Sequence, residues 1–562
     1  MKRFCGRPLS IALGINLVVL AISLILGDGK YNSLDDYFMS AVLTGAYGGN
    51  YDVHLYFINV AYGYFLMPFY ALFPKMGWYA IFESFSIFAS FTAISFVIIR
   101  RCGHKLGFIL TLLFTVSVSF EFYTHVAFTQ CAGATTAAGI LLFTVGSAEK
   151  KRSDLAFACL FMIAGIIFRK EMFLVGVPTL TALLLFSFVR NKKIWKGSLI
   201  VLALFALAYA GLGKINSLHY QSDGYDYYAA YQGPRAYFGD GAFYDANNFV
   251  AELDDRGLTS RDYRYLRAWY FYDNNVFSLD SIRNLMRIAE RSRFEPNYLK
   301  IPFAVIKAIS DNLMHGHTWC WALLCLALMF FSNQKNWYVP WASLFLICIP
   351  YTYLLLVNRV VGHVEVGIWV YTVVFLLFFV DKKDFYENKR LNSFLQITSL
   401  ICVASLTISG THIAFDKLSI ENINANTKTN TNWDAFLTYA KDHPSDVFLL
   451  PFDHYKNLAR HVGYTRSSIE PGYWNNIFST GYWNIHLPAM ERELKERGVN
   501  NIIKDVINDN VYMLSDMYQL SLIPYYSDHY HEKICADTLA SFGNINLLKY
   551  RKGESENEKA QH

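Results

Sequence analysis

Two adjacent carboxylates, Asp35 and Asp36, follow the first long apolar stretch of the chain and are the first residues that could do chemistry. At a membrane boundary the dielectric is lower than in water, and this raises the pKa of a carboxylate toward neutrality. Such a group could act as a general base. The same pair could instead stabilise the start of a helix, with Ser33 or Asp35 as its N-cap. Spacing alone leaves both interpretations open.

Two short charged turns between apolar stretches could bind an anion. Arg169 and Lys170 precede Glu171 in one turn, and Arg359 and His363 lie in another. A guanidinium suits multidentate contacts with phosphate, and a histidine adds a donor that depends on pH. Arg169, Lys170, Arg359 and His363 are therefore candidates for binding the phosphate of a lipid. Basic side chains also extend toward lipid headgroups for purely structural reasons, and this alternative stays open.

Two further carboxylates lie close to these turns. Glu83 is about two helical turns into the next apolar stretch, and Glu121 flanks a short turn. A carboxylate inside a membrane is a candidate functional residue, although a hydrogen bond to a neighbouring helix explains it equally well. The tyrosines that follow position 220 could stack on sugar rings, or could simply populate the membrane interface.

The elements that position these residues are predicted to be membrane-spanning helices. Of the 562 residues 54% are hydrophobic and only 17% are charged, and mean hydropathy is +0.22. A soluble protein carries about 25% charged residues. About 11 stretches approach the ~20 residues that a span requires: Ser10–Leu26, Gly77–Ile99, Leu106–Phe120, Val126–Gly146, Leu155–Phe168, Met172–Val189, Gly197–Gly213, His317–Ser332, Tyr338–Val357, Val366–Val380 and Leu391–Gly410.

Basic residues set the predicted orientation, because short cytoplasmic loops collect Lys and Arg. The clusters around Arg100, Lys150, Arg190 and Lys382 fall on the cytoplasmic side only if Leu55–Phe73 does not cross the membrane. We therefore expect Leu55–Phe73 to lie in the outer interface. The N-terminus is then inside and the C-terminus outside.

This topology predicts four regions. Residues 1–410 form a transmembrane module with large outer loops at 27–76 and 214–316, and residues 411–432 form a polar linker. Residues 433–552 form an extracytoplasmic α/β domain with a helix at Trp433–Asp442, a strand at Asp446–Pro451, a helix at Ala489–Gly498 and a last strand at Ile545–Tyr550. Residues 553–562 form a polar tail.

Several classes of protein are excluded. A net charge of +5, spread over the whole chain, does not indicate nucleic-acid binding. No phosphate-binding Gly-rich loop, CxxC zinc motif or disulfide framework is present. The substrates are therefore expected on the outer side, and the absence of N-x-S/T sequons favours a bacterial plasma membrane.

An N-terminal span, an Asp-Asp pair in the first outer loop, many further spans and an outer C-terminal domain resemble the GT-C membrane glycosyltransferases. The stretch from Asp35-Asp36 through Asp52, and the stretch from Arg235 through Asp240 to Trp269, are similar to uncharacterised bacterial envelope proteins grouped with that family. The resemblance implies inverting transfer from a polyprenyl-phosphate-linked sugar, with Asp36 as base and Asp35 as the next candidate. It also implies that Asp52, Arg235 and Asp240 shape the substrate site, and we add Glu83 and Glu121 as candidates because of their positions in and beside the spans.

We therefore predict an integral membrane glycosyltransferase of the bacterial plasma membrane with its active site on the extracytoplasmic side. Its partners would be a lipid-linked sugar donor, an envelope glycan or glycolipid acceptor, and membrane lipids. Some members of the family use a divalent cation, but no separate metal motif is present. The alternatives are a polysaccharide or lipid-linked glycan transporter or flippase, and an envelope glycan polymerase or ligase. Charges that cluster at turns rather than at mid-span, and the absence of a repeat, disfavour a transporter.

Overall fold

The computed structural model describes most of the chain. The described residues are 2–26, 31, 33–124, 126–191, 196–222, 224–239, 250–255, 257–291, 298–313, 318–331, 337–357, 360–380, 393, 397, 401, 420–462, 466–515 and 522–553.

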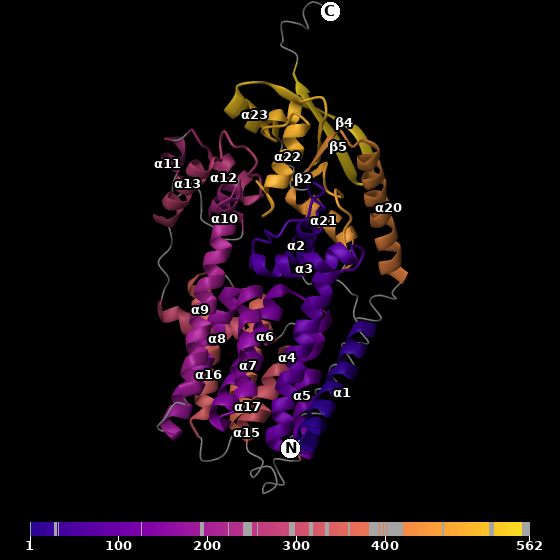
Figure 1. Ribbon diagram of the computed structural model, residues 1–562. Helices are drawn as coiled ribbons and strands as arrows, with labels where there is room; N and C mark the ends of the chain where they lie inside the picture. Colours follow the sequence, from indigo (N-terminus) through magenta and orange to yellow (C-terminus); the bar gives the residue numbers. More distant parts are fainter. Residues whose placement is uncertain are drawn as a thin grey trace, which may run out of the picture.

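Long apolar helices form a bundle in which they run roughly along one another (Figure 1). They are α1 (Lys2–Leu26), α4 (Trp78–Cys102), α5 (His104–Thr124), α6 (Phe128–Glu149), α7 (Arg152–Phe168), α8 (Lys170–Asn191), α9 (Lys196–His219), α15 (Thr318–Phe331), α16 (Val339–Leu356) and α17 (Gly362–Phe379). Within the described ranges, seven of them are long and apolar enough to cross a membrane, namely α1, α4, α6, α8, α9, α16 and α17. The predicted spans coincide with helices of this bundle. The exception is Leu391–Gly410, which lies outside the described residues apart from three positions.

Helix α6 is the central helix of the bundle, since every residue from Phe128 to Gly146 is buried. Glycines let its neighbours approach closely, as is common between membrane helices. A Cβ atom at Gly139 would lie 2.6 Å from Cγ of Met162 on α7, and one at Gly133 would lie 3.4 Å from Cα of Gly367 on α17. This packing fixes the N-terminus of α6 at one end of the bundle.

Two short helices, α2 (Leu34–Leu43) and α3 (Val60–Leu72), lie across the upper end of the bundle in Figure 1. Both have a polar N-cap: the side chains of Ser33 and Asn59 accept hydrogen bonds from backbone N–H groups of the first turn. Helix α3 has 13 residues, fewer than the ~20 needed to span the hydrocarbon layer. Its length and position agree with the interfacial helix expected for Leu55–Phe73.

A mainly helical segment follows α9 at the same upper end of the bundle (Figure 1). It contains α10 (Tyr225–Gly239), α11 (Val250–Asp254), α12 (Ser260–Arg267), α13 (Leu279–Arg291), η2 (Tyr298–Lys300) and α14 (Ile301–Leu313). Helix α9 continues to His219, so the bundle extends a few residues into the loop that was predicted to begin at Lys214.

The C-terminal region folds around a five-stranded sheet with strand order β2-β1-β3-β5-β4. Strand β1 pairs in parallel with β2 and β3, whereas β5 pairs antiparallel with β3 and β4. Its elements are α20 (Ile420–Asp442), β1 (Val447–Leu450), α21 (Phe452–Val462), β2 (Ile477–Ser479), α22 (Pro488–Glu496), η4 (Lys504–Ile507), β3 (Val511–Leu514), α23 (Leu522–Tyr530), β4 (Ile534–Phe542) and β5 (Ile545–Lys552). The predicted linker differs from this structure, because 420–432 is helical and continues into the helix expected at 433–442.

The sheet region contacts both other upper parts of the molecule. Backbone N–H groups of Gly472 and Trp474 donate to the carbonyls of Gly45 and Ala46, each at 2.8 Å. Phe38 of α2 stacks on Tyr455 of α21 with ring centroids 4.7 Å apart. The first loop is therefore held against a domain that lies more than 400 residues later in the chain.

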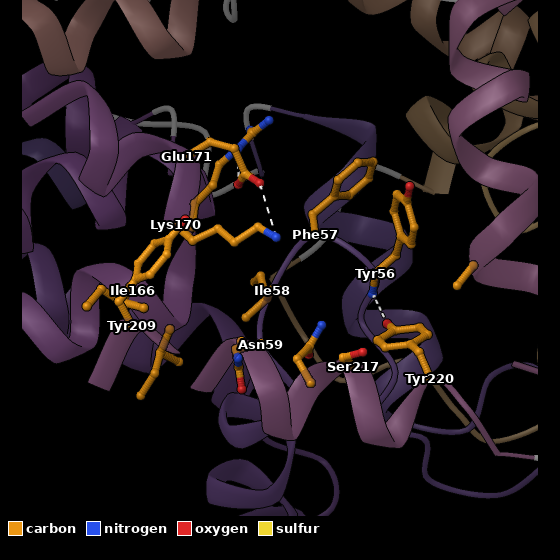
Figure 2. A pocket seen from close by; sticks show the side chains of 15 residues that line it. Tyr56, Phe57, Ile58, Asn59, Ile166, Lys170, Glu171, Tyr209, Ser217 and Tyr220 are labelled. Atoms are coloured by element: carbon orange, nitrogen blue, oxygen red, sulfur yellow. Dashed lines mark hydrogen bonds and ion pairs between the residues drawn. The ribbon is translucent and has the colours of Figure 1, made fainter. Parts of the chain in front are cut away.

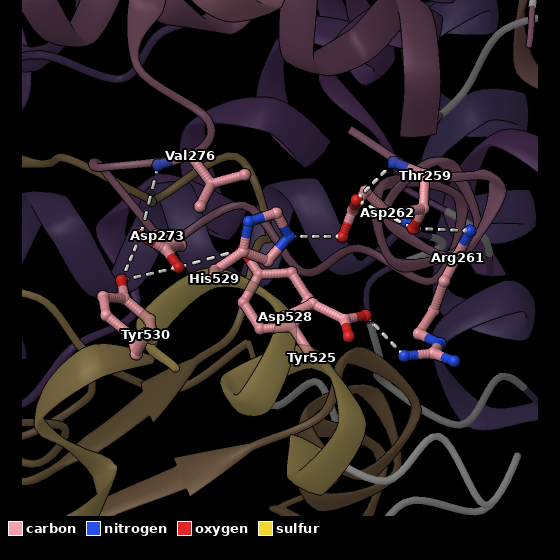
Figure 3. A network of polar contacts seen from close by, with 9 residues as sticks. All are labelled: Thr259, Arg261, Asp262, Asp273, Val276, Tyr525, Asp528, His529 and Tyr530. Atoms are coloured by element: carbon pink, nitrogen blue, oxygen red, sulfur yellow. Dashed lines mark hydrogen bonds and ion pairs between the residues drawn. The ribbon is translucent and has the colours of Figure 1, made fainter. Parts of the chain in front are cut away.

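A polar network joins the α12 region to α23 (Figure 3). The buried carboxylate of Asp273 accepts hydrogen bonds from the hydroxyls of Tyr525 and Tyr530 at 2.8–2.9 Å. Beside it, Asp262 pairs with His529 at 2.8 Å. This network and the contacts of the first loop gather three distant segments at one end of the bundle.

The chain starts at the opposite, lower end of the bundle (Figure 1). Basic residues gather there: Arg100 at the C-terminal end of α4 pairs with Asp154 at 2.6 Å and with Glu149 at 3.4 Å. The predicted cytoplasmic clusters at 100–105 and 150–152 thus lie at the same end as the N-terminus, and the Asp-Asp pair lies at the other.

Candidate active site

The start of α2 gives Asp35 and Asp36 different surroundings. Ser33 is the N-cap, as one interpretation of the sequence predicted, and its hydroxyl accepts the Asp36 N–H at 3.3 Å. The same hydroxyl donates to Asp36 Oδ2 at 2.7 Å. Both aspartates lie in the first turn, where negative charge is favoured by the helix dipole.

Asp36 is fully buried and connects three helices. Its Oδ1 accepts hydrogen bonds from the Tyr79 hydroxyl of α4 at 3.0 Å and from the Phe128 N–H, at the start of α6, at 3.1 Å. Burial raises the pKa of Asp36 to about 6; the hydrogen bonds from Ser33, Phe128 and Tyr79 oppose this rise, and the charge of Asp35 adds to it. Asp36 does not line any of the cavities described below.

Asp35 is only partly buried and faces a cavity. Its Oδ1 accepts a hydrogen bond from the hydroxyl of Tyr482 in the C-terminal domain. Burial raises the pKa of Tyr482, and the charge of Asp35 raises it further. Tyr482 therefore remains a neutral phenol that donates to Asp35 and fixes the direction of its carboxylate.

The cavity beside Asp35 has a volume of about 610 Å³ and is mainly apolar. Four places bring charged or titratable groups to its wall: Asp35 from α2, Arg169 from the α7–α8 turn, Glu171 from the first turn of α8 and His363 from the first turn of α17. The rest of the wall comes chiefly from α8, α16 and α17, through Met172, Leu174, Val175, Pro178, Ile349, Pro350, Tyr353, Leu354, Val357, Val361 and Val364. An aspartate, an arginine and a histidine predicted from separate parts of the sequence thus share one cavity.

The side chain of Arg169 is held in place by residues at the start of α6. Its Nη1 donates to Oγ1 of Thr129 at 2.6 Å, and its guanidinium lies 5.0 Å from the centre of the Phe128 ring. Glu171 approaches its Nε at 4.0 Å. Because Phe128 also donates its N–H to Asp36, the buried carboxylate and the guanidinium are positioned by the same residue.

A second cavity of about 450 Å³ adjoins the first and is more polar (Figure 2). The two share Phe57, Arg169 and Glu171 in their walls. The second cavity is lined further by Tyr56, Ile58, Asn59, Ile166, Ile167, Lys170, Tyr209, Gly213, Asn216, Ser217, Tyr220 and Ala229. Lys170 lies on this side, 3.8 Å from Glu171. The arrangement is one apolar and one polar compartment separated by an arginine.

Two of the predicted substrate-shaping residues lie beside these cavities rather than in their walls. Asp52 accepts hydrogen bonds from Nδ1 of His54 at 2.7 Å and from the Tyr225 hydroxyl at 2.5 Å. Arg235 is buried, and its guanidinium lies 5.1 Å from the centre of the Trp269 ring. Asp52 thus joins the first loop to α10, and Arg235 joins α10 through Trp269 to the residues that follow α12.

The two predicted carboxylates of the bundle also stand outside the cavity walls. Glu83 is fully buried in α4; its oxygens make no hydrogen bond within the described residues, and Asp36 lies near enough to repel it electrostatically. Glu121 lies in the last turn of α5. Arg359 and Asp240 lie outside the described residues.

A divalent cation has no evident set of ligands in the part of the chain that the structure describes. No three His, Cys, Asp or Glu side chains are grouped so that they could hold a metal ion there. The two adjacent aspartates accept hydrogen bonds from different groups, Asp35 from Tyr482 and Asp36 from Ser33, Tyr79 and Phe128.

Sequence reasoning missed several residues that build the site. Tyr482 orients Asp35 from 447 residues away, and Phe57 lines both cavities. Thr129 anchors Arg169 from 40 residues away. Nothing in their local sequence distinguishes them from the many other tyrosines, phenylalanines and threonines of the chain.

Comparison with known proteins gave a match to a solved structure. No family model and no curated protein match this chain. The crystal structure of ArnT from Cupriavidus metallidurans, bound to undecaprenyl phosphate, is similar over 95% of this chain and 97% of that one, with 11% identity and a TM-score of 0.42. A likeness this distant carries no information about activity, which has to be argued from the residues of this chain.

Proposed function

We propose that this protein is an integral membrane glycosyltransferase that moves a sugar from a polyprenyl-phosphate-linked donor to an envelope glycan or glycolipid. The observation that carries the proposal is the mainly apolar cavity whose wall combines Asp35, Arg169 and His363. A carboxylate can accept the proton of a reacting hydroxyl, and a cation and an imidazole can bind a phosphate. The large apolar wall suits the lipid chain that carries this phosphate.

The lipid chain of the donor would lie along α8, α16 and α17, whose cavity-facing residues are almost all apolar. Its phosphate would lie at Arg169 and His363, with Lys170 near enough to draw the headgroup from the polar side. Arginine binds phosphate oxygens well because its N–H groups are fixed in a plane. The contact of Arg169 with Thr129 would keep the guanidinium in place before the donor arrives.

In the transfer step, Asp35 would accept the proton of the acceptor hydroxyl while that oxygen attacks C1 of the sugar. The bond from C1 to the phosphate oxygen breaks, and polyprenyl phosphate leaves with the electron pair. A single displacement inverts the configuration at C1 and requires no covalent nucleophile. Tyr482 would hold the Asp35 carboxylate toward the acceptor.

This assignment reverses the order of the two aspartates that we expected from the sequence. Asp36 is enclosed by Ser33, Tyr79 and Phe128 and lines no described cavity, whereas Asp35 does. Asp36 is therefore proposed as a positioning residue, which acts through Phe128 on Arg169.

The acceptor would enter through the polar cavity, which meets the apolar one at Phe57, Arg169 and Glu171. Tyr56, Tyr209 and Tyr220 in its wall suit a carbohydrate, because aromatic faces with a polar tip pack against sugar rings. We further propose that this end of the bundle is extracytoplasmic and that the membrane is a bacterial plasma membrane. The basic turns at the opposite end support this orientation.

The test compares the sugar composition of the cell surface in cells that lack the protein and in cells complemented with wild type or Asp35→Asn. We expect one sugar to disappear without the protein, to return with wild type and to stay below about 1% of wild type with Asp35→Asn, because general-base catalysis is worth about 10²–10⁴-fold. Asp226→Asn, which changes an exposed aspartate of α10, should restore the sugar fully. Full restoration by Asp35→Asn, with equal protein level, would rule out the proposed base.

A further inference from the structure

A third cavity lies between α1 and α4 and shares no lining residue with the two described above. Its volume is about 510 Å³, and its wall is made by Leu20, Leu24, Lys75, Gly77, Ala80, Ile81, Ser84, Phe85, Phe88, Arg466 and Ser467. The lining residues run from Lys75, just before α4, along that helix to Phe88, so the cavity is a groove on the side of α4.

One face of α4 forms the floor of the groove. Gly77, Ile81, Ser84 and Phe88 recur every three or four residues, so they lie one above another on the helix. From Gly77 to Phe88 this face extends over about 16 Å at the helical rise of 1.5 Å per residue. Leu20 and Leu24 of α1 face it. The result is a long apolar surface of the kind that accommodates an acyl chain.

The charges of the groove are confined to its upper end. Lys75 and Arg466 are its only charged lining residues in the part of the chain that the structure describes, and both lie beside the N-terminus of α4. The positive end of that helix dipole adds to their field. An anion at this end of the groove would therefore meet two cationic lining residues, of which Arg466 is also attracted to the buried carboxylate of Glu83.

The cationic end is also built rigidly. Nη2 of Arg466 donates to the carbonyls of Tyr123 and Thr124, both at 3.1 Å, at the C-terminal end of α5. The backbone of Arg466 packs so closely on Gly77 that a Cβ atom there would lie 1.7 Å from the Arg466 carbonyl oxygen. Arg466 is thus held at the mouth of the groove by the end of α5 and the start of α4.

We propose that this groove binds one lipid with an anionic headgroup from the surrounding membrane. The headgroup would lie at Lys75 and Arg466, and one acyl chain would lie along α4 between Phe85, Phe88 and α1. Charge complementarity selects an anionic lipid over a zwitterionic one, since each basic residue near a membrane surface contributes about 1 kcal/mol to its attraction. The inference depends on α1 and α4 facing lipid and not on the transferase reaction.

The experiment measures binding of phosphatidylglycerol and of phosphatidylcholine to the detergent-purified full chain, by native mass spectrometry. We expect phosphatidylglycerol to bind at least about fivefold more tightly, the equivalent of the contribution of one basic residue. Ser84→Trp should remove this binding by filling the groove, and Lys75→Gln should weaken it about fivefold. Leu185→Trp, on an exposed face of α8, should bind as wild type does.

Three results would overturn the inference: equal binding of the two lipids, unchanged binding in both Ser84→Trp and Lys75→Gln, or full competition by inorganic phosphate alone. The last result would indicate an anion site without a lipid chain. If Ser84→Trp does not fold, Lys75→Gln decides the question, because Lys75 is exposed and its replacement leaves the packing of α4 intact.

Discussion

Asp35 and Asp36 are neighbours in the chain but have opposite environments, and this difference decides which of them could react. The first turn of α2 directs Asp36 inward to Ser33, Tyr79 and Phe128, while Asp35 reaches the apolar cavity. The pair and its place after the first span were evident in the sequence. The choice between its members was not, because it depends on the N-terminus of α6 and on Tyr482, both distant in the chain.

At the residue scale, the raised pKa of Asp36 predicts a pH-dependent stability. Its pKa is about 6 in the folded protein and 3.8 in the unfolded chain, so the folded state binds more protons between these values. The stabilisation of the folded state by proton binding to Asp36 is fully present below pH 3.8 and is lost as the pH rises through 6. Between pH 5 and pH 7 the unfolding free energy of wild type should therefore fall by about 1 kcal/mol relative to Asp36→Asn.

Thermal unfolding in detergent at several pH values measures this difference. Asparagine keeps a carbonyl oxygen that can accept from Phe128 and Tyr79, so the variant should fold. Asp226→Asn serves as the control and should follow wild type at every pH, because Asp226 is exposed. If the unfolding free energies of wild type and Asp36→Asn depend on pH in the same way, Asp36 does not have a raised pKa in the folded protein.

At the scale of elements, apolar length predicted the helices of the bundle far better than local pattern predicted the sheet. The strand at β1 and the last strand at β5 were recognisable as apolar runs. Strand β2 has only three residues, and β3 includes the polar Tyr512, so neither is a continuous apolar run as the four residues of β1 are. The Asn- and Thr-rich stretch before Trp433 has weak helix propensity, so its composition did not predict that the first part of α20 would be helical.

The junction between α12 and α23 makes an element-scale prediction. Burial alone would lower the pKa of His529, but the hydrogen bond and charge of Asp262, with the charges of Asp273 and Asp528, outweigh burial and raise it. The pKa of this histidine is higher in the folded state. The resulting stabilisation is therefore present below pH 6.5 and is lost as the pH rises through the higher value.

Hydrogen exchange of α12 and α23 at pH 6 and pH 8.5 checks this junction. After correction for the intrinsic exchange rate, protection in wild type should be lower at pH 8.5 by an amount on the order of 1 kcal/mol, the typical worth of one hydrogen bond. His529→Gln keeps a donor without titrating, so its protection should be the same at both pH values. Equal protection of wild type at the two pH values would show that protonation of His529 does not stabilise the contact between α12 and α23.

At the scale of the whole molecule, the bundle separates a polar end from a basic end. The first loop, the α10–α13 segment and the sheet domain gather at one end, and the N-terminus and Arg100 lie at the other (Figure 1). Hydropathy and basic residues predicted this division. The meeting of two cavities at Arg169 could not be predicted, because it depends on how α7, α8, α16 and α17 pack.

Cysteine labelling tests the proposed orientation of the two ends. In a Cys535→Ser background, which removes an exposed thiol of the sheet domain, single cysteines replace Asn50, Ser445 or Lys151, all exposed. A membrane-impermeant maleimide added to intact cells should label positions 50 and 445, whereas position 151 should react only after the membrane is opened. Labelling of position 151 in intact cells, or protection of position 50 or 445, would contradict the orientation.

The most direct test of the central claim is the level of polyprenyl-phosphate-linked sugar in lipid extracts of cells that carry wild type or Asp35→Asn, measured by mass spectrometry. If Asp35 is the base that consumes this donor, the loaded lipid should accumulate several-fold with Asp35→Asn while the variant protein reaches the wild-type level in the membrane. If the Asp35→Asn cells contain only the wild-type amount of polyprenyl-phosphate-linked sugar, Asp35 is not the base that consumes this donor.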